Sequence, residues 1–199
     1  TAAGIKEGKF GLALIRASGT AAGVFTSNRM RAAPVEVMME RIRRGRLDAV
    51  VVNSGCANAY TGERGYRDAL EMSAIAADAL NLDPASVGVA STGVIGRYLD
   101  LDLIRDQCSR VAPLLARSAD AEAAAARAIM TTDTFPKHAL VETESFTVGG
   151  ITKGSGMIAP NMGTMLAFIY TDAEVEAPVL QDILRQATRR SFNRVVVDG

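Results

Sequence analysis

Short apolar runs alternate with amphipathic stretches along the chain, and this order limits the folds that it can adopt. The segments "DAVVVNSG" at residues 48–55 and "VGVAS" at residues 87–91 are typical of buried strands, because each is short, rich in valine and followed by small polar residues or glycine. Between them, residues 63–80 carry apolar side chains mainly on one side of a helix. Helices mixed with buried and half-buried strands indicate an α/β or α+β fold.

The same reasoning predicts the other elements. Further strands are expected at residues 10–17, within residues 137–150 as one or two strands, in the run after Thr164, and at residues 194–197. Further helices are expected at residues 34–42, 101–115, 119–129 and 178–192. The chain stops just after its last strand-like run, where no following element would cover that strand, so we expect the protein to continue beyond Gly199.

Composition and charge exclude several classes of protein. With 199 residues and 48% hydrophobic side chains, the chain is long and apolar enough for one domain or at most two. Lys plus Arg and Asp plus Glu both total 22, so no net field favours nucleic acid or an acidic membrane. Two cysteines and one histidine make neither a zinc pattern nor a disulfide framework. With no signal peptide and no membrane-spanning stretch in the sequence, we expect a cytoplasmic protein without a metal.

Thr164 lies where a polar, glycine-rich segment meets an apolar strand-like run, in "KGSGMIAPNMGTMLAFIYTDA". Gly163 tolerates backbone conformations closed to other residues, and strain at its carbonyl would favour attack by the Thr164 hydroxyl. The cut would create an N-terminal threonine whose α-amino group, with a pKa of about 8, acts as the base for its own hydroxyl. The alternative is a threonine that only begins a strand, as β-branched residues often do.

Three other stretches have the form of strand exits. In "STGVIG" at residues 91–96, an exposed turn after a strand, the Thr92 hydroxyl or amide and the Gly93 amide can point at a developing oxyanion. The segment "MTTDTFPK" at residues 130–137 is either a substrate-facing loop or a capped turn, and "NSGCANAYTG" at residues 53–62 is a similar exit. Each is an ordinary turn when taken alone.

Together these motifs identify a family resemblance. Six blocks occur in the family's order: "TAAGVFTSNRMRAAPV", "VVNSGCANAYTG", "STGVIG", "MTTDT", "KGSGMIAPNMGTMLAFIYTDA" and "SFNRVVVDG". The chain resembles the ornithine acetyltransferase family, the glutamate N-acetyltransferases and bifunctional amino-acid acetyltransferases of arginine biosynthesis. The resemblance implies an α+β fold, a layered αββα-type sandwich like that of N-terminal-nucleophile enzymes.

The resemblance also implies self-cleavage between Gly163 and Thr164. Residues 1–163 would form one subunit, and residues 164–199 would begin the nucleophile-bearing one. The family usually has alanine before its cleaving threonine, whereas this chain has Gly163. Both residues are small, so the expected effect is on the rate of cleavage rather than on its occurrence.

By the same resemblance, five residues acquire roles. Thr164 is the nucleophile that carries the acetyl group as an ester and contacts substrate, Thr92 and Gly93 form the oxyanion hole, and Thr131 and Lys153 contact substrate. The amine of Lys153 can bind a substrate carboxylate or lower the pKa of the Thr164 amine. The alternative is that Lys153 is a solvated loop residue. The resemblance implies that the family's remaining site residues, a glutamate and C-terminal residues of the second subunit, lie beyond Gly199.

The implied reaction moves an acetyl group from N2-acetylornithine to glutamate through an acetyl-threonine intermediate, with no bound cofactor. Whether acetyl-CoA is a second donor is left open by the sequence. The implied partners are the second subunit of the same precursor and further copies in an oligomer of cleaved pairs.

Other interpretations have different consequences. An aminopeptidase-like hydrolase of similar fold would pass the acyl group to water, and an uncleaved relative would only bind. If Cys56 were a nucleophile with His138 as its base, the protein would be a thiol acyltransferase or a cysteine hydrolase. The commoner interpretation is that Cys56 is a buried cysteine that packs as a small apolar residue. The string "GGITKGSG" has lysine before glycine, the reverse of a phosphate-binding loop, which argues against a nucleotide site.

Overall fold

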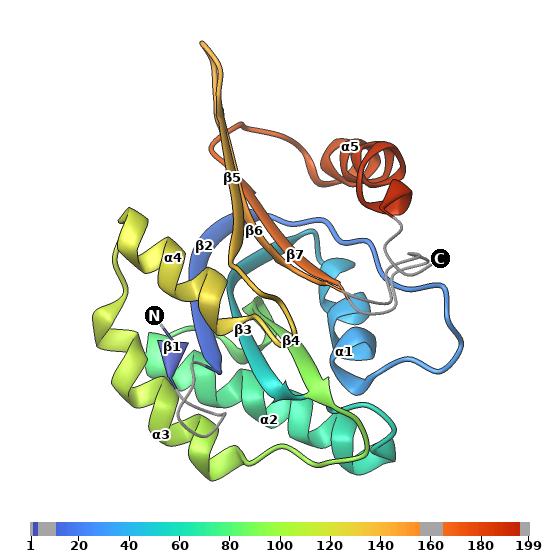
Figure 1. Cartoon of the computed structure of the whole chain (residues 1–199), viewed down its shortest axis with the longest axis vertical. Coiled ribbons are helices and arrows are strands. Elements are labelled where there is room, and N and C mark those ends of the chain that lie inside the picture. The colour runs from blue at the N-terminus through green and yellow to red at the C-terminus, as the bar shows by residue number, and fades with distance from the viewer. Residues whose placement is uncertain (1, 4–10, 156–164, 196–199) are drawn as a thin grey trace.

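The structure, a computed structural model, describes residues 2–3, 11–155 and 165–195 (Figure 1). One sheet has the strand order β1-β2-β3-β4, and a second has the order β5-β6-β7. The strands are β1 (Ala2–Ala3), β2 (Leu12–Thr20), β3 (Arg46–Cys56), β4 (Val87–Val94), β5 (Lys137–Glu142), β6 (Thr147–Lys153) and β7 (Leu166–Thr171). The helices are α1 (Ala33–Ile42), α2 (Gly62–Leu80), α3 (Leu101–Val111), α4 (Ala119–Ala128) and α5 (Ala177–Arg190).

Strands β3 and β4 are the parallel pair of the first sheet, and α2 makes the crossover between them. Their register runs from Ala49 opposite Val87 to Cys56 opposite Val94. Both strands therefore end at the same edge, the place where parallel sheets commonly bind ligands.

The two faces of the first sheet pack against different layers, because alternate side chains of a strand point to opposite sides. One face forms a core with α1, α2 and α3, which includes Leu12, Leu14, Val51, Val89, Val37, Met72 and Ile104. The other face packs against α4 and the second sheet, in a cluster that includes Ala13, Val52, Ala126, Ile129 and Ile151. Figure 1 shows α5 across the second sheet from α4. The predicted α+β class with stacked sheets between helices is confirmed.

Several predicted elements differ in their limits, among them the strand expected at residues 10–17, which is Leu12–Thr20. The helix expected over residues 101–115 ends at Val111 and continues as a 3-10 turn, Ala112–Leu114, because Pro113 has no N–H to donate. The strand expected at residues 194–197 is wrong at its start, since Phe192–Arg194 form a 3-10 turn, and residues 196–199 lie outside the described part of the chain. Strand β4 continues to Val94 instead of ending at Ser91.

Candidate active site

The ends of β3 and β4 form the first wall of the candidate site. The buried side chain of Asn53 donates a hydrogen bond of 2.8 Å to the Ser91 hydroxyl and one of 3.0 Å to the Cys56 carbonyl, which ties the two strand ends together. Gly93 lies opposite Gly55 with a φ of +130°, a backbone conformation that favours glycine. A Cβ added at Gly93 would approach the carbonyl carbon of Gly55 to 2.4 Å. Thr92 and Gly93 thus belong to β4, and the predicted turn begins only after Val94.

We expect Gly93→Ala to destabilise the protein more than Gly96→Ala does. Both glycines have positive φ, but a Cβ at Gly96 would have no neighbour within 4 Å. The control variant therefore suffers backbone strain of about 1 kcal/mol, whereas Gly93→Ala adds a clash and should lose about 2–5 kcal/mol. Thermal unfolding of the two variants would show the difference. Equal melting temperatures would contradict the close approach of β3 and β4.

The loop at residues 130–136 forms the second wall. The Ser54 hydroxyl, at the end of β3, donates a hydrogen bond to the carbonyl of Ala128, the last residue of α4. Ile129, which follows, is fully buried. The hydrogen bond from Ser54 and the burial of Ile129 hold the end of α4 beside the ends of β3 and β4. The loop that carries Thr131 therefore starts next to the first wall.

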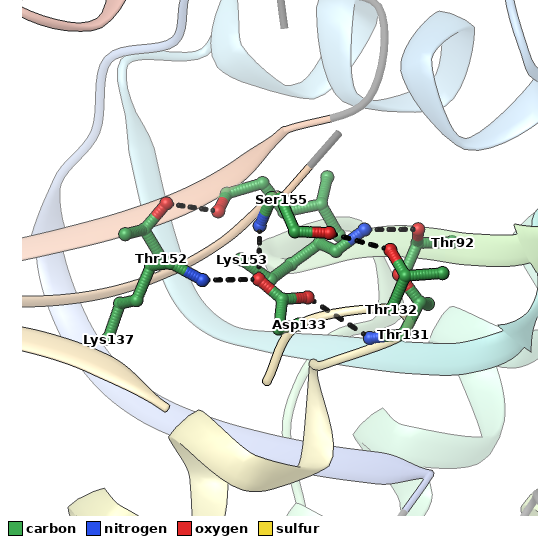
Figure 2. A network of polar contacts seen from close by, with 10 residues as sticks. Thr92, Thr131, Thr132, Asp133, Lys137, Thr152, Lys153 and Ser155 are labelled. Atoms are coloured by element: carbon green, nitrogen blue, oxygen red, sulfur yellow. Dashed lines mark hydrogen bonds and ion pairs between the residues drawn. The ribbon is translucent and has the colours of Figure 1, made fainter. Parts of the chain in front are cut away.

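Lys153 joins the two sheets across the site (Figure 2). It is the last residue of β6 and only 3% exposed, and its Nζ donates a hydrogen bond of 3.2 Å to Thr92 Oγ1. The reading of Lys153 as a solvated loop residue is therefore wrong. Burial lowers the pKa of the Lys153 amine, an effect that Asp133 opposes and Lys137 adds to. Because the Thr92 oxygen accepts this bond, its hydroxyl proton is not used in it and can be donated elsewhere, as an oxyanion donor requires.

Asp133 connects the 130–136 loop to the end of β6. Its Oδ1 accepts hydrogen bonds from Lys137 Nζ at 2.6 Å and from the Gly154 amide at 2.7 Å, and its Oδ2 accepts one from the Thr131 amide at 3.2 Å. Burial raises the pKa of the Asp133 carboxyl, but these bonds outweigh it and hold the pKa below its ordinary value. No motif in the sequence assigned a role to Asp133, although an aspartate inside a row of threonines was the available signal.

The structure brings four predicted site residues to one place: Thr92, Gly93, Thr131 and Lys153. Gly163 and Thr164 lie outside the described residues. Leu166, two positions after Thr164, pairs with Lys153, and the Thr152 hydroxyl donates to the Leu166 carbonyl at 2.8 Å. Strand β7 therefore starts directly beside Lys153. The assignment of Thr164 as nucleophile stays a prediction.

Two other interpretations of the sequence do not fit the structure. The Cys56 thiol donates to the carbonyl of Arg97 at 3.1 Å, and its pKa is raised by burial, which disfavours a thiolate nucleophile. His138, in β5, lies 3.4 Å from Glu122, whereas the thiol of Cys56 contacts the carbonyls of Arg97 and Tyr98. The lysine of "GGITKGSG" ends a strand instead of sitting in a loop before a helix, which a phosphate-binding loop needs.

The described residues contain no group of three or more His, Cys, Asp or Glu side chains arranged to hold a metal ion. Within the same ranges, no helix is long and apolar enough to cross a bilayer.

Comparison with known proteins identifies the family. A model described as the ArgJ family matches residues 1–199. The chain belongs to the ArgJ family. It is 54% identical over 201 residues to the glutamate N-acetyltransferase of Methanosarcina mazei, covering 100% of this chain and 51% of that protein. It is 52% identical to the arginine biosynthesis bifunctional protein ArgJ of Archaeoglobus fulgidus, covering 98% and 51%. This ArgJ-family chain thus spans about half the length of the curated relatives it matches.

Solved structures of the ArgJ family share its fold. The ornithine acetyltransferase of Mycobacterium tuberculosis, solved as a complex with ornithine, has a TM-score of 0.78 and 40% identity, covering 80% of this chain and 88% of that one. An ArgJ structure from Bacillus halodurans has a TM-score of 0.71 and 41% identity, covering 80% and 86%. The resemblance to ornithine acetyltransferases drawn from the sequence motifs is confirmed.

Proposed function

We propose that the full-length protein transfers an acetyl group from N2-acetylornithine to glutamate in arginine biosynthesis. The observation that carries this proposal is the contact of Lys153 with Thr92, which places a buried cation and a hydroxyl together beside the start of β7. A relative that shares 54% identity is named glutamate N-acetyltransferase, and a related structure holds ornithine. The cationic amine of Lys153 suits amino-acid substrates, since each carries a carboxylate.

The proposed reaction has two acyl-transfer steps. Thr164, freed by cleavage after Gly163, attacks the acetyl carbonyl of N2-acetylornithine while its own α-amino group takes the hydroxyl proton. The C–N bond breaks, ornithine leaves with that proton, and an acetyl ester remains on Thr164. The amine of glutamate then attacks the ester, which releases N-acetylglutamate and restores the threonine hydroxyl. Thr92 and Gly93 donate to the oxyanion in both steps.

The sheet explains how two cleaved fragments would stay together. Strand β7 belongs to the predicted second subunit, yet it pairs with β6 over six positions, from Lys153 opposite Leu166 to Val148 opposite Thr171. A cut after Gly163 leaves these backbone hydrogen bonds in place. We further propose that the cleaved pairs form an oligomer in the cytoplasm, the partners and location expected from the family.

The test uses purified full-length protein. We expect mass spectrometry to show two fragments divided between Gly163 and Thr164, and incubation with N2-acetylornithine alone to add one acetyl group to the Thr164-led fragment. Addition of glutamate should remove that group, and initial rates should give the parallel double-reciprocal lines of a ping-pong mechanism. An uncut, unacetylated protein would contradict the proposal.

The same assay separates the alternatives. A hydrolase would turn over N2-acetylornithine without glutamate and release acetate. Transfer to glutamate from acetyl-CoA would establish a second donor.

A further inference from the structure

Asp133 is a fully buried carboxylate in a surface loop. Its side chain is 0% exposed, although Thr132 and Thr134 on either side are exposed. Burying a carboxylate is costly unless hydrogen bonds compensate it. Asp133 accepts three such bonds, and two of them come from backbone amides, those of Thr131 and Gly154.

These bonds link the two segments that carry the predicted substrate contacts. The amide of Thr131 belongs to the 130–136 loop, and the amide of Gly154 follows Lys153 directly at the end of β6. A second contact reinforces the link, because the hydroxyls of Thr132 and Ser155 lie 2.8 Å apart (Figure 2). Loss of the Asp133 carboxylate would leave two amides without their acceptor and release the loop from β6.

We propose that Asp133 is a positioning residue that fixes Thr131 and the Lys153 amine relative to each other. It contacts neither substrate nor the reacting atoms, because its carboxylate is enclosed by its own partners. It acts through two routes: the backbone bonds set the separation of the two segments, and its negative charge favours the protonated form of Lys153. The kinetic consequence rests on the function proposed above, whereas the consequence for the Lys153 amine does not.

The charged groups around Lys153 make the second route testable. Asp133, from the 130–136 loop, raises the pKa of the Lys153 amine, and Lys137, the first residue of β5, lowers it. From β4, the group that faces the amine is the neutral Thr92 hydroxyl. From β7, the residue opposite is Leu166. His138 lies on the same face of the second sheet, opposite Ile151, and is paired with Glu122. Removing Asp133 or Lys137 should therefore move the Lys153 pKa in opposite directions.

The experiment compares Asp133→Asn with Lys137→Met in the full-length protein. NMR of the lysine Nζ, assigned with Lys153→Arg, gives the pKa of the amine in each variant. We expect the pKa to fall in Asp133→Asn and to rise in Lys137→Met. A carboxylate that only stabilised the loop would not produce opposite shifts. Absent shifts, or shifts of the same sign, would overturn the proposal.

Acetyl-transfer kinetics test the first route. In Asp133→Asn the Nδ2 group, a hydrogen-bond donor, faces the Thr131 amide, which is also a donor, so this bond is lost. Because Thr131 is then no longer held in place, we expect kcat/KM to fall by about tenfold to a hundredfold. Lys137→Met keeps both backbone bonds and should lose less. Equal losses in the two variants, or none in Asp133→Asn, would overturn positioning by Asp133. If the parent protein transfers no acetyl group, the proposed function fails while the NMR result still decides the inference. If Asp133→Asn does not fold, Asp133→Ser, which also removes the carboxylate charge, replaces it in both measurements with the same expected directions.

Discussion

Replacing Thr164 by alanine in the full-length protein is expected to give a single uncut chain with no detectable acetyl transfer. Alanine has no hydroxyl to attack the Gly163 carbonyl and none to carry an acetyl group, so both proposed steps lose their nucleophile. Loss of a covalent nucleophile lowers kcat by on the order of a millionfold where it has been measured. Mass spectrometry reports the cut, and transfer from N2-acetylornithine to glutamate reports the activity.

Thr164→Ser is the matched control, because it keeps the hydroxyl and loses only a methyl group. We expect this variant to be cut and to retain measurable transfer. A cut elsewhere in the chain, or transfer by Thr164→Ala, would contradict the assignment of the nucleophile. Loss of activity in Thr164→Ser as well would point to a structural need for threonine at this position.

The strands that form the site were predicted from the sequence more accurately than the side-chain contacts between those strands. Short valine-rich runs followed by small polar residues or glycine located β3 and β4, and the structure places the ends of these strands side by side. The extent of β4 was underestimated because Thr-Gly is typical of a turn, whereas parallel pairing with β3 keeps Thr92 and Gly93 in the strand.

Contacts across the two sheets could not be predicted from local pattern. Lys153 and Thr92 are separated by 61 positions and lie in different sheets, and their approach follows from how Ile151 and Val52 pack in the core between them. The strands predicted within residues 137–150 ended before Lys153, and no local pattern indicated that the side chain of Lys153 is buried. Only the family resemblance identified the residue as part of the site.

The contact between Lys153 and Thr92 leads to the second large expected effect, on catalysis by Thr92→Ala. If the Thr92 hydroxyl donates to the oxyanion, the bond strengthens as charge develops on the acetyl oxygen, so the variant should lose kcat more than it raises KM. Removal of one such donor costs about a hundredfold to a thousandfold in kcat, or roughly 3 to 4 kcal/mol of barrier.

Thr92→Ala can lower activity in three ways: by slowing catalysis, by slowing self-cleavage, and by removing the contact with Lys153. The experiment has to separate these effects. Self-cleavage also passes through an oxyanion, so Thr92→Ala is expected to mature slowly, and kcat has to be measured on protein shown to be fully cut. Thr92→Ser keeps both the hydroxyl donor and the acceptor for the Lys153 ammonium, and should recover most of the loss. Near-normal kcat with raised KM in fully cut Thr92→Ala would instead make Thr92 a substrate-binding residue, and the oxyanion donors would then have to be found elsewhere in the site.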